Sequence, residues 1–191
     1  MHHHFIIYKP SGYISQFVRN EGKRRNKKLL GELFDFPEST MAIGRLDENS
    51  EGLLLLTTDG QISELVRSKN VEKEYYVQVN GEITHQAILK LREGVEIGLG
   101  RGKKYQTLPC KVSLLKTAPD LKPVVRIRGE RHGPTSWLSI TINEGKFRQI
   151  RKMTAAVGFP TLRLIRIRIG NIELPKMEAG EVIKVDGFDY E

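Results

Sequence analysis

The chain has 191 residues, of which 31 are Lys or Arg and 23 are Asp or Glu, and its formal net charge is +8. This length suits one domain, or one core divided into two lobes around a cleft. The positive charge favours a polyanionic partner such as nucleic acid and also allows an anionic membrane surface. The longest apolar run, Leu53–Leu56, is far too short to span a bilayer, so we expect a soluble cytoplasmic protein.

The sequence offers few ligands for a metal. The first four residues, MHHH, read as the remnant of a purification tag, so residues 1–4 are set apart from the fold. His85, His132 and the single Cys110 remain, too few for a histidine-built site or an internal disulfide. We therefore expect no metal, and Cys110 to be a small buried apolar residue.

The first part of the chain predicts two strands and a helix. Residues 5–8 read as a strand that ends at the turn residues of KPSG. A basic loop follows at residues 19–28, before an apolar helical turn. The four leucines at 53–56 predict a buried strand, after which Asp59 can cap a helix over residues 60–68.

The middle of the chain is regular at first and then less so. Residues 73–79 predict a strand that places Tyr75 on one face and Tyr76 on the other. Thr84 is the expected cap of a helix that stops at Gly94. Residues 95–134 read as sheet with long loops, including strands at KVSLLK and PVVRIRG.

The last third predicts strand, helix and strand. Residues 135–142 alternate as a strand, and residues 146–158 read as a helix closed by Gly158. Its expected packed stripe is Phe147, Ile150, Thr154 and Val157, beside a basic face of Arg148, Arg151 and Lys152.

A second strand at LRLIRIRIG has alternation that slips at Leu164 and Ile165, which a bulge would explain. Helices therefore alternate with strands that look antiparallel. We expect an α+β fold with a mixed or antiparallel sheet.

A carboxylate stands in the turn of GRLDENSEGLLLLTTDG, between Gly44 and Gly52. Read alone, Asp47 is a cap or a solvated loop residue. A carboxylate that serves as a nucleophile must stay ionised in a dry site, which requires a fixed cation, and we favour Arg151 for that cation. A glycosidase-like pair of Asp47 with Glu48 or Glu51 stays open.

Four stretches together, namely YKPSG, GRLDENSEGLLLLTTDG, KEYYVQV and EGKFRQIRKM, resemble the pseudouridine synthases that modify ribosomal RNA at single uridines. The resemblance runs from about Phe5 to Ile183. It implies a mixed, mostly antiparallel sheet flanked by helices, with two lobes around a central cleft. Residues 5–191 would form the catalytic domain, without the small N-terminal S4 RNA-binding domain that many members carry.

The resemblance also implies an activity. The expected reaction isomerises one uridine of 23S ribosomal RNA to pseudouridine, needs no cofactor, and requires the base to be flipped into a pocket. Asp47 matches the catalytic aspartate. The expected partner is 23S ribosomal RNA, free or in an assembling large subunit, with no membrane partner, and a monomer is the simplest state.

By the same match, Tyr75 would stack on the flipped uracil, Ile150 would wall the pocket and Arg151 would pair with Asp47. Arg45 would fill the gap left by the base or hold the backbone beside it. The residues expected to contact the RNA are Lys9, Arg24, Arg25, Arg148 and Lys152. Lys9 and Pro10 also match a motif that would shape the floor of the cleft, or they form a plain turn. The basic runs 19–28, 101–104 and 126–131 would contact phosphates or are ordinary solvated surface.

Two other classes of function stay open. One is a ribosome-assembly or RNA-binding module in which the loop with Asp47 is only structural. The other is a hydrolase that uses a pair of carboxylates.

Overall fold

The computed structural model describes residues 2–18, 27–68, 71–122 and 132–189. The chain forms two compact units: unit 1 comprises Met1–Val71 and Ile165–Glu191, and unit 2 comprises Glu72–Leu164. Arg24, Arg25 and the strand expected at PVVRIRG lie outside the described residues.

Unit 1 is built on a mixed sheet in the order β11-β1-β3-β9, with β2 also paired to β3 and β10 to β9. β3 and β9 run parallel, whereas the other pairs in this unit are antiparallel. Its elements are β1 (His4–Lys9), η1 (Leu30–Glu32), β2 (Met41–Ile43), β3 (Glu51–Thr57), α1 (Gly60–Ser68), the end of β9 (Thr161–Ile169), β10 (Ile172–Glu173) and β11 (Val182–Val185).

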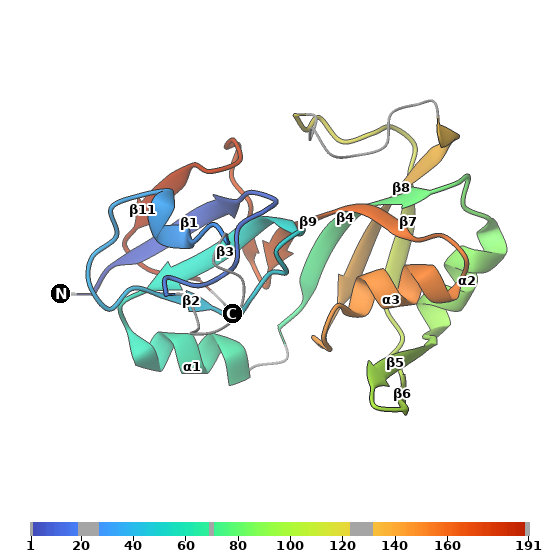
Figure 1. Cartoon of the computed structure of the whole chain (residues 1–191), viewed down its shortest axis with the longest axis horizontal. Helices are drawn as coiled ribbons and strands as arrows, with labels where there is room; N and C mark the ends of the chain where they lie inside the picture. Colours follow the sequence, from blue (N-terminus) through green and yellow to red (C-terminus); the bar gives the residue numbers. More distant parts are fainter. Residues whose placement is uncertain (1, 19–26, 69–70, 123–131, 190–191) are drawn as a thin grey trace. The chain divides into compact units, whose positions relative to one another are not determined.

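The leucine strand lies at the centre of this unit because both of its faces are covered. Leu53 and Leu55 pack in a core cluster with Val66 of α1, the helix that lies along β2 and β3 (Figure 1). On the other face, Leu56 is paired with Phe5, whose ring contacts two further phenylalanines, Phe34 and Phe36. This explains why four consecutive leucines form a strand without alternation.

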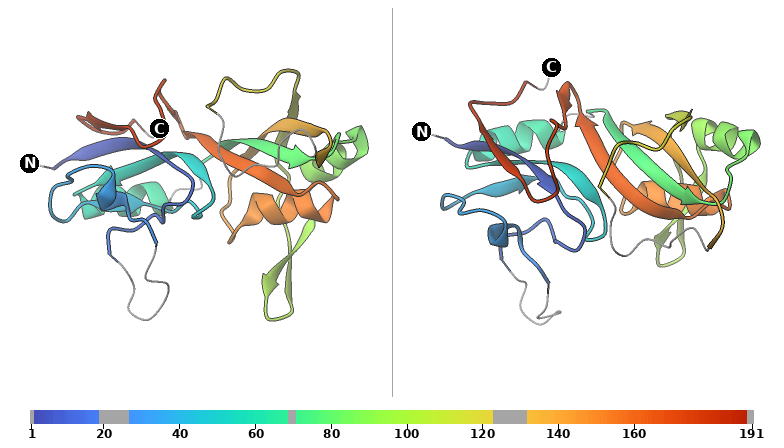
Figure 2. Two further views of the ribbon diagram at one scale, coloured as in Figure 1. Left: turned by 45° about the horizontal axis from the view of Figure 1, so that its top comes forward. Right: turned by 90° about the horizontal axis from the view of Figure 1, so that it is seen from above.

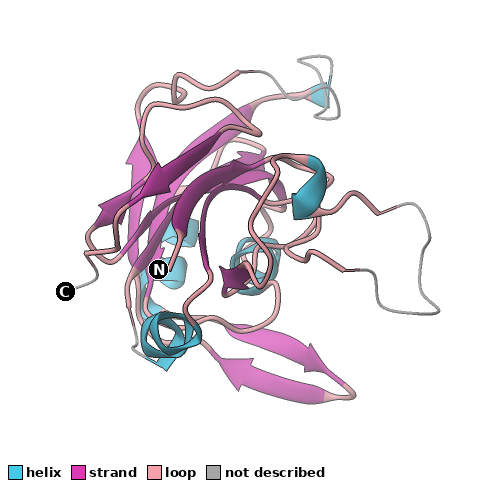
Figure 3. Cartoon of the chain, turned by 90° about the vertical axis from the view of Figure 1, so that its left-hand side faces the viewer, coloured by secondary structure: helices cyan, strands magenta, loops and turns pink. Residues whose placement is uncertain are grey.

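Unit 2 contains the antiparallel strands β4 (Lys73–Asn80), β8 (Thr135–Ile142) and β7 (Lys111–Leu115), in that order. Two helices accompany them, α2 (His85–Glu93) and α3 (Gln149–Ala156). A separate two-stranded hairpin, β5 (Glu96–Gly100) and β6 (Lys103–Gln106), lies beside α3 (Figure 1). Figure 3 shows that strands form a larger part of the structure than helices. The predicted α+β class with a mixed sheet is confirmed.

Local sequence signals place most of these elements as expected. In β4, Tyr75, Val77 and Val79 are buried and their neighbours are half-buried, which is the predicted alternation. The Thr84 hydroxyl accepts a hydrogen bond from the amide of Ala87, and the Asp59 carboxylate accepts one from Gln61. Both predicted helix caps are confirmed.

The prediction for α3 is wrong at its N-terminus. The helix begins at Gln149 because Arg148 has a φ of 52° and caps it in the left-handed conformation. Phe147 therefore precedes the helix and is 72% exposed, instead of packing in the predicted stripe. Met153 fills the core position on α3 and is fully buried.

The irregular alternation of β9 coincides with its passage from unit 2 to unit 1, between Leu164 and Ile165. All four residues from Arg163 to Arg166 are buried, two arginines included. Burial on both faces removes the period-two pattern at this point. Among the described residues, no helix has the length and apolar character needed to cross a membrane.

Candidate functional site

The turn that carries Asp47 joins β2 to β3 in unit 1. It is closed by a hydrogen bond from the amide of Ser50 to the carbonyl of Asp47, at 3.0 Å. Gly44 enters the turn with a φ of 72°, and Gly52 follows it with a φ of 98°. A Cβ at Gly52 would overlap the backbone oxygen of Arg166 on β9, so glycine is required here for the close approach of the two strands. Asp47 itself is half-buried.

Lys9, at the end of β1, fixes the backbone beside Asp47. Its side chain is fully buried, and its ammonium donates to the carbonyls of Pro10 at 2.8 Å, Tyr13 at 2.6 Å and Glu48 at 3.3 Å. An ammonium has three N–H donors, so these contacts can satisfy all of them. The loop after β1 and the turn with Asp47 are thus held by one buried cation.

Further hydrogen bonds join the same two segments. The amide of Gly12 donates to the carbonyl of Glu48 at 2.7 Å. The Ser15 hydroxyl donates to the carbonyl of Leu46 at 2.8 Å and accepts from its amide at 3.0 Å. Backbone groups on both sides of Asp47 are therefore fixed, which favours a single geometry for its carboxylate.

Lys9 lies among other charged side chains of unit 1, and its pKa reflects both its burial and these neighbours. Burial lowers the pKa of Lys9 from 10.5 to about 7; the carboxylates of Glu51 and Asp47 oppose this shift and the guanidinium of Arg166 adds to it. Glu51 and Arg166 are only 2% and 4% exposed. Two carboxylates and two cations therefore interact within unit 1.

Arg166 is a functional candidate that sequence reasoning missed. Its Nε donates to the carbonyl of Leu53 at 2.8 Å, and its Nη2 is buried without a hydrogen-bond partner among the residues that the structure describes. The sequence signal for it is the break in alternation of LRLIRIRIG, for which a bulge is the expected cause. A charged residue inside a strand that is covered on both faces explains that break equally well.

The expected role of Lys9 in RNA contact is corrected by its burial. A side chain with no exposed surface and an ammonium bonded to three carbonyls cannot reach a phosphate. Lys9 acts on the backbone next to Asp47 instead. Arg45, by contrast, is exposed two positions before Asp47, and its contact with RNA stays a prediction.

The other predicted substrate-binding residues belong to unit 2. Tyr75 on β4 is 8% exposed and is paired with Ile140 of β8. Ile150, in the first turn of α3, is 3% exposed, and Arg151 beside it is half-buried. The ion pair between Arg151 and Asp47 of unit 1 stays a prediction.

The carboxylate-pair hydrolase loses support. Glu51 is buried at the start of β3, and the Glu48 carboxylate forms an ion pair with Lys27. Glu51 is withdrawn from solvent and Glu48 is paired with a cation, which disfavours both as the second acid of such a pair.

Metal and thiol chemistry find no support in the described part of the chain. No cluster of three or more His, Cys, Asp or Glu side chains there could hold a metal ion. The Cys110 thiol donates to the carbonyl of Leu91 at 3.1 Å, and burial raises the pKa of this thiol to about 11. A thiol that stays protonated is a poor nucleophile.

Comparison with known proteins identifies a family. The family described as RNA pseudouridylate synthase matches residues 3–156. The chain is 42% identical to ribosomal large subunit pseudouridine synthase E of Vibrio parahaemolyticus, over 92% of this chain and 71% of that protein. It is 41% identical to the protein of the same name from Xanthomonas axonopodis pv. citri, over 88% of this chain and 86% of that protein.

A solved structure supports the same family assignment. A crystal structure of a pseudouridylate synthase shares the fold with a TM-score of 0.76 and 27% identity, over 97% of this chain and 70% of that chain.

Proposed function

Because the chain belongs to the RNA pseudouridylate synthase family, we propose that it isomerises a specific uridine of 23S ribosomal RNA to pseudouridine, with Asp47 as the nucleophile. The chain is similar to proteins named ribosomal large subunit pseudouridine synthase E and B, and these names support 23S ribosomal RNA as the substrate. We propose residues 5–191 as the catalytic domain, acting as a cytoplasmic monomer in large subunit biogenesis, on free RNA or on an assembling particle.

The reaction exchanges one bond of the uracil for another. The bond between N1 and the ribose C1′ breaks, a bond between C5 and C1′ forms, the proton on C5 leaves, and N1 gains a proton. Atoms and electrons balance without an oxidant or a group carrier. The carboxylate can attack C1′, attack the uracil ring, or assist elimination of the base.

The braced turn of Asp47 is the observation that carries the proposal. Lys9, Gly12 and Ser15 hold the backbone on both sides of the carboxylate, and the Lys9 ammonium is electrostatically coupled to it. A nucleophile fixed in this way loses little entropy when it attacks. An ordinary solvated turn needs no such buried cation.

The remaining residues have proposed roles in holding the flipped base. Tyr75 offers a ring face to uracil, Ile150 gives an apolar wall, and Arg151 pairs with Asp47 to keep it ionised. Arg45, which is exposed, fills the gap in the RNA or holds its backbone.

The test is Asp47→Asn, assayed on an unmodified 23S rRNA fragment labelled with tritium at uridine C5. Loss of the C5 proton releases the label, so the parent should release tritium and the variant should release none while binding the fragment with unchanged affinity. The control is Asp35→Asn, which alters an exposed carboxylate of the same unit. Release by Asp47→Asn at the parent rate would contradict the assignment.

Tritium release, together with a map of modified bases in a deletion strain, separates an enzyme from a pure RNA-binding module. A module would bind the fragment without releasing tritium, and the map of modified bases in the rRNA would be unchanged in a deletion strain. If the protein is the proposed enzyme, one uridine should stay unmodified in that strain, because the protein that modifies it is missing.

A further inference from the structure

Unit 2 carries aromatic rings and basic side chains at the start of α3 and along the neighbouring β5–β6 hairpin. We call this set of side chains the Phe147 surface; its residues are Arg101, Lys103, Tyr105, Lys146, Phe147 and Lys152. We propose that the Phe147 surface binds the single-stranded RNA that carries the target uridine, with Phe147 stacking on an unpaired base and Arg101 and Lys103 contacting phosphates. This inference rests on the proposed function.

Phe147 is directed outward by the backbone. The left-handed conformation of Arg148, with a φ of 52°, delays the start of α3 and leaves the ring 72% exposed. A phenylalanine ring that is this exposed is available to stack on a partner, which would remove its apolar surface from water. The ammonium of Lys152 lies 5.3 Å from the ring centroid, so a cation already occupies a position beside the ring.

A second ring lies in the same surface. The ammonium of Lys146 is 4.7 Å from the centroid of Tyr105, and the Tyr105 hydroxyl donates to the Glu144 carboxylate at 2.5 Å. That hydrogen bond raises the pKa of Tyr105 above its ordinary value of 10.0, so the ring stays neutral. Two aromatic rings are therefore each accompanied by a lysine.

Glu144 fixes the hairpin to the start of α3. Its second carboxylate oxygen accepts from the amide of Leu108 at 2.9 Å and from the Gln149 side chain at 2.6 Å. At the base of the hairpin, the amide of Val95 donates to the Thr107 hydroxyl at 2.9 Å, and Ile97 is buried. The hairpin and the Phe147 turn are held together before any RNA binds, which reduces the entropy lost on binding.

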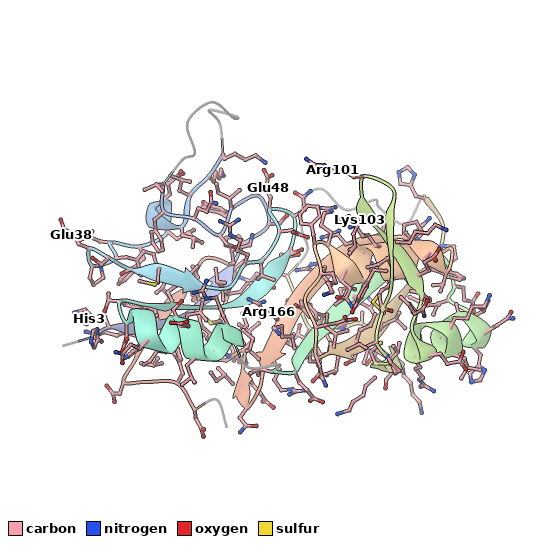
Figure 4. The ribbon with its side chains drawn as sticks, turned by 90° about the horizontal axis from the view of Figure 1, so that it is seen from below. His3, Glu38, Glu48, Arg101, Lys103 and Arg166 are labelled. Carbon is pink, nitrogen blue, oxygen red and sulfur yellow. The ribbon has the colours of Figure 1, made fainter. Side chains whose placement is uncertain are left out.

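The tip of the hairpin brings positive charge. Arg101, with a φ of 49°, and Lys103 are exposed on either side of Gly102, whereas Lys104 is paired with Glu96 at 2.8 Å. Figure 2 shows that the hairpin extends away from the β4–β8–β7 strands, and Figure 4 labels Arg101 and Lys103 at its end. These side chains can follow a phosphate backbone.

The chemistry of this surface selects single-stranded RNA as its partner. Stacking rings interleaved with lysines and arginines are the features of single-strand binding, because every base has a π-face and every nucleotide has a phosphate. A membrane surface needs a broader apolar face than one phenylalanine among cations. In double-stranded RNA the bases are already stacked on one another.

The stacking step is tested with Phe147→Ala and a labelled single-stranded RNA oligonucleotide. Loss of one stacked base should weaken binding about 5- to 150-fold, while Phe147→Trp, which keeps a ring, should bind at least as tightly as the parent. The matched control is Leu114→Ala, which removes another exposed apolar side chain of unit 2 and should leave affinity unchanged. Parent affinity in Phe147→Ala would overturn the proposal.

The phosphate contacts are tested by the salt dependence of binding. The double variant Arg101→Gln and Lys103→Gln should make the slope of log K against log salt shallower by about 1.4, since each phosphate contact on a single strand contributes about 0.7. The control pair Lys90→Gln and Lys116→Gln has the same charge change at other exposed sites of the unit and should keep the parent slope. Equal slopes for both double variants would overturn this part.

The outcomes also separate this inference from the proposed function. If the parent releases tritium but Phe147→Ala and the hairpin variant bind RNA like the parent, the Phe147 surface is wrong and the function stands. If the parent binds RNA through this surface but releases no tritium, the surface stands and the function is wrong.

Discussion

The ammonium of Lys9 lies 3.3 Å from the carbonyl oxygen of Glu48, the residue that follows Asp47 in the chain. The end of one strand therefore controls the backbone next to the proposed nucleophile. The two residues are 39 positions apart, and the contact is made by a side chain without exposed surface. This relationship leads to predictions on catalysis, on pH and on stability.

We expect Lys9→Met to lower kcat about 10- to 100-fold with little change in KM, because it loosens the turn of Asp47 but removes no RNA contact. Well above pH 7, where burial has already removed the charge of Lys9, the variant should also lose about 1–3 kcal/mol of unfolding free energy, since buried carbonyls lose their donor. Steady-state tritium release and urea unfolding measure the two effects. Lys184→Met, at an exposed lysine of unit 1, is the control. A rise in KM alone would show that Lys9 acts on RNA.

The lowered pKa of Lys9, about 7 instead of 10.5, makes stability depend on pH. Between these two values the unfolded chain holds a proton that the folded chain has lost, so this group makes unfolding free energy rise with pH. The cost of the buried charge is fully present below about pH 7 and is relieved above it. Compared with Lys9→Met, the parent should gain up to about 1.4 kcal/mol per pH unit in this window. Urea unfolding from pH 7 to 10 measures this difference, and equal pH dependence of the unfolding free energy in the parent and in Lys9→Met would contradict the prediction.

Gly52→Ala should destabilise the protein more than Gly12→Ala does. Both glycines have a positive φ, 98° and 91°, so both substitutions carry the backbone strain of that conformation. A Cβ at Gly12 meets no atom within 4 Å, whereas one at Gly52 overlaps the carbonyl of Arg166. The overlap should add about 1–3 kcal/mol to the loss, measured by urea unfolding. Equal losses would mean that β3 and β9 can separate without cost.

Tyr75→Leu should reduce kcat/KM about 5- to 150-fold, the effect of losing one stacked base. Tyr76→Leu, on the opposite face of β4, should reduce it little, because only the Tyr75 side is the proposed uracil face. Thermal unfolding of both variants separates a catalytic loss from a packing loss. A larger effect at Tyr76 would reverse the assignment of the two faces.

Local signals made much of the fold predictable. The caps at Asp59 and Thr84 and the alternation in β4 depend on residues close in sequence, and each was found where it was expected. The start of α3 was not predictable in this way. The left-handed φ of Arg148 is unfavourable for arginine, so it must be imposed by packing that a single helical window does not contain.

The proposed nucleophile could be singled out from the sequence, whereas the residues that support its turn could not. Asp47 was singled out by its motif. Lys9 was expected to contact RNA or to shape the cleft floor, and nothing near it in the sequence signals that its ammonium is buried against three carbonyls. Its acceptors at Tyr13 and Glu48 come from two loops that only the fold brings together. Arg166 could not be recognised from the sequence either, because its cross-strand partner Gly52 is far from it in the chain.

The acceptors of Lys9 are main-chain carbonyls, a group that every amino acid possesses. Substitutions at Pro10, Tyr13 and Glu48 would therefore leave the acceptors in place, provided that the backbone path is kept. The side chains of these two loops can therefore vary while a single lysine preserves the position of the proposed nucleophile.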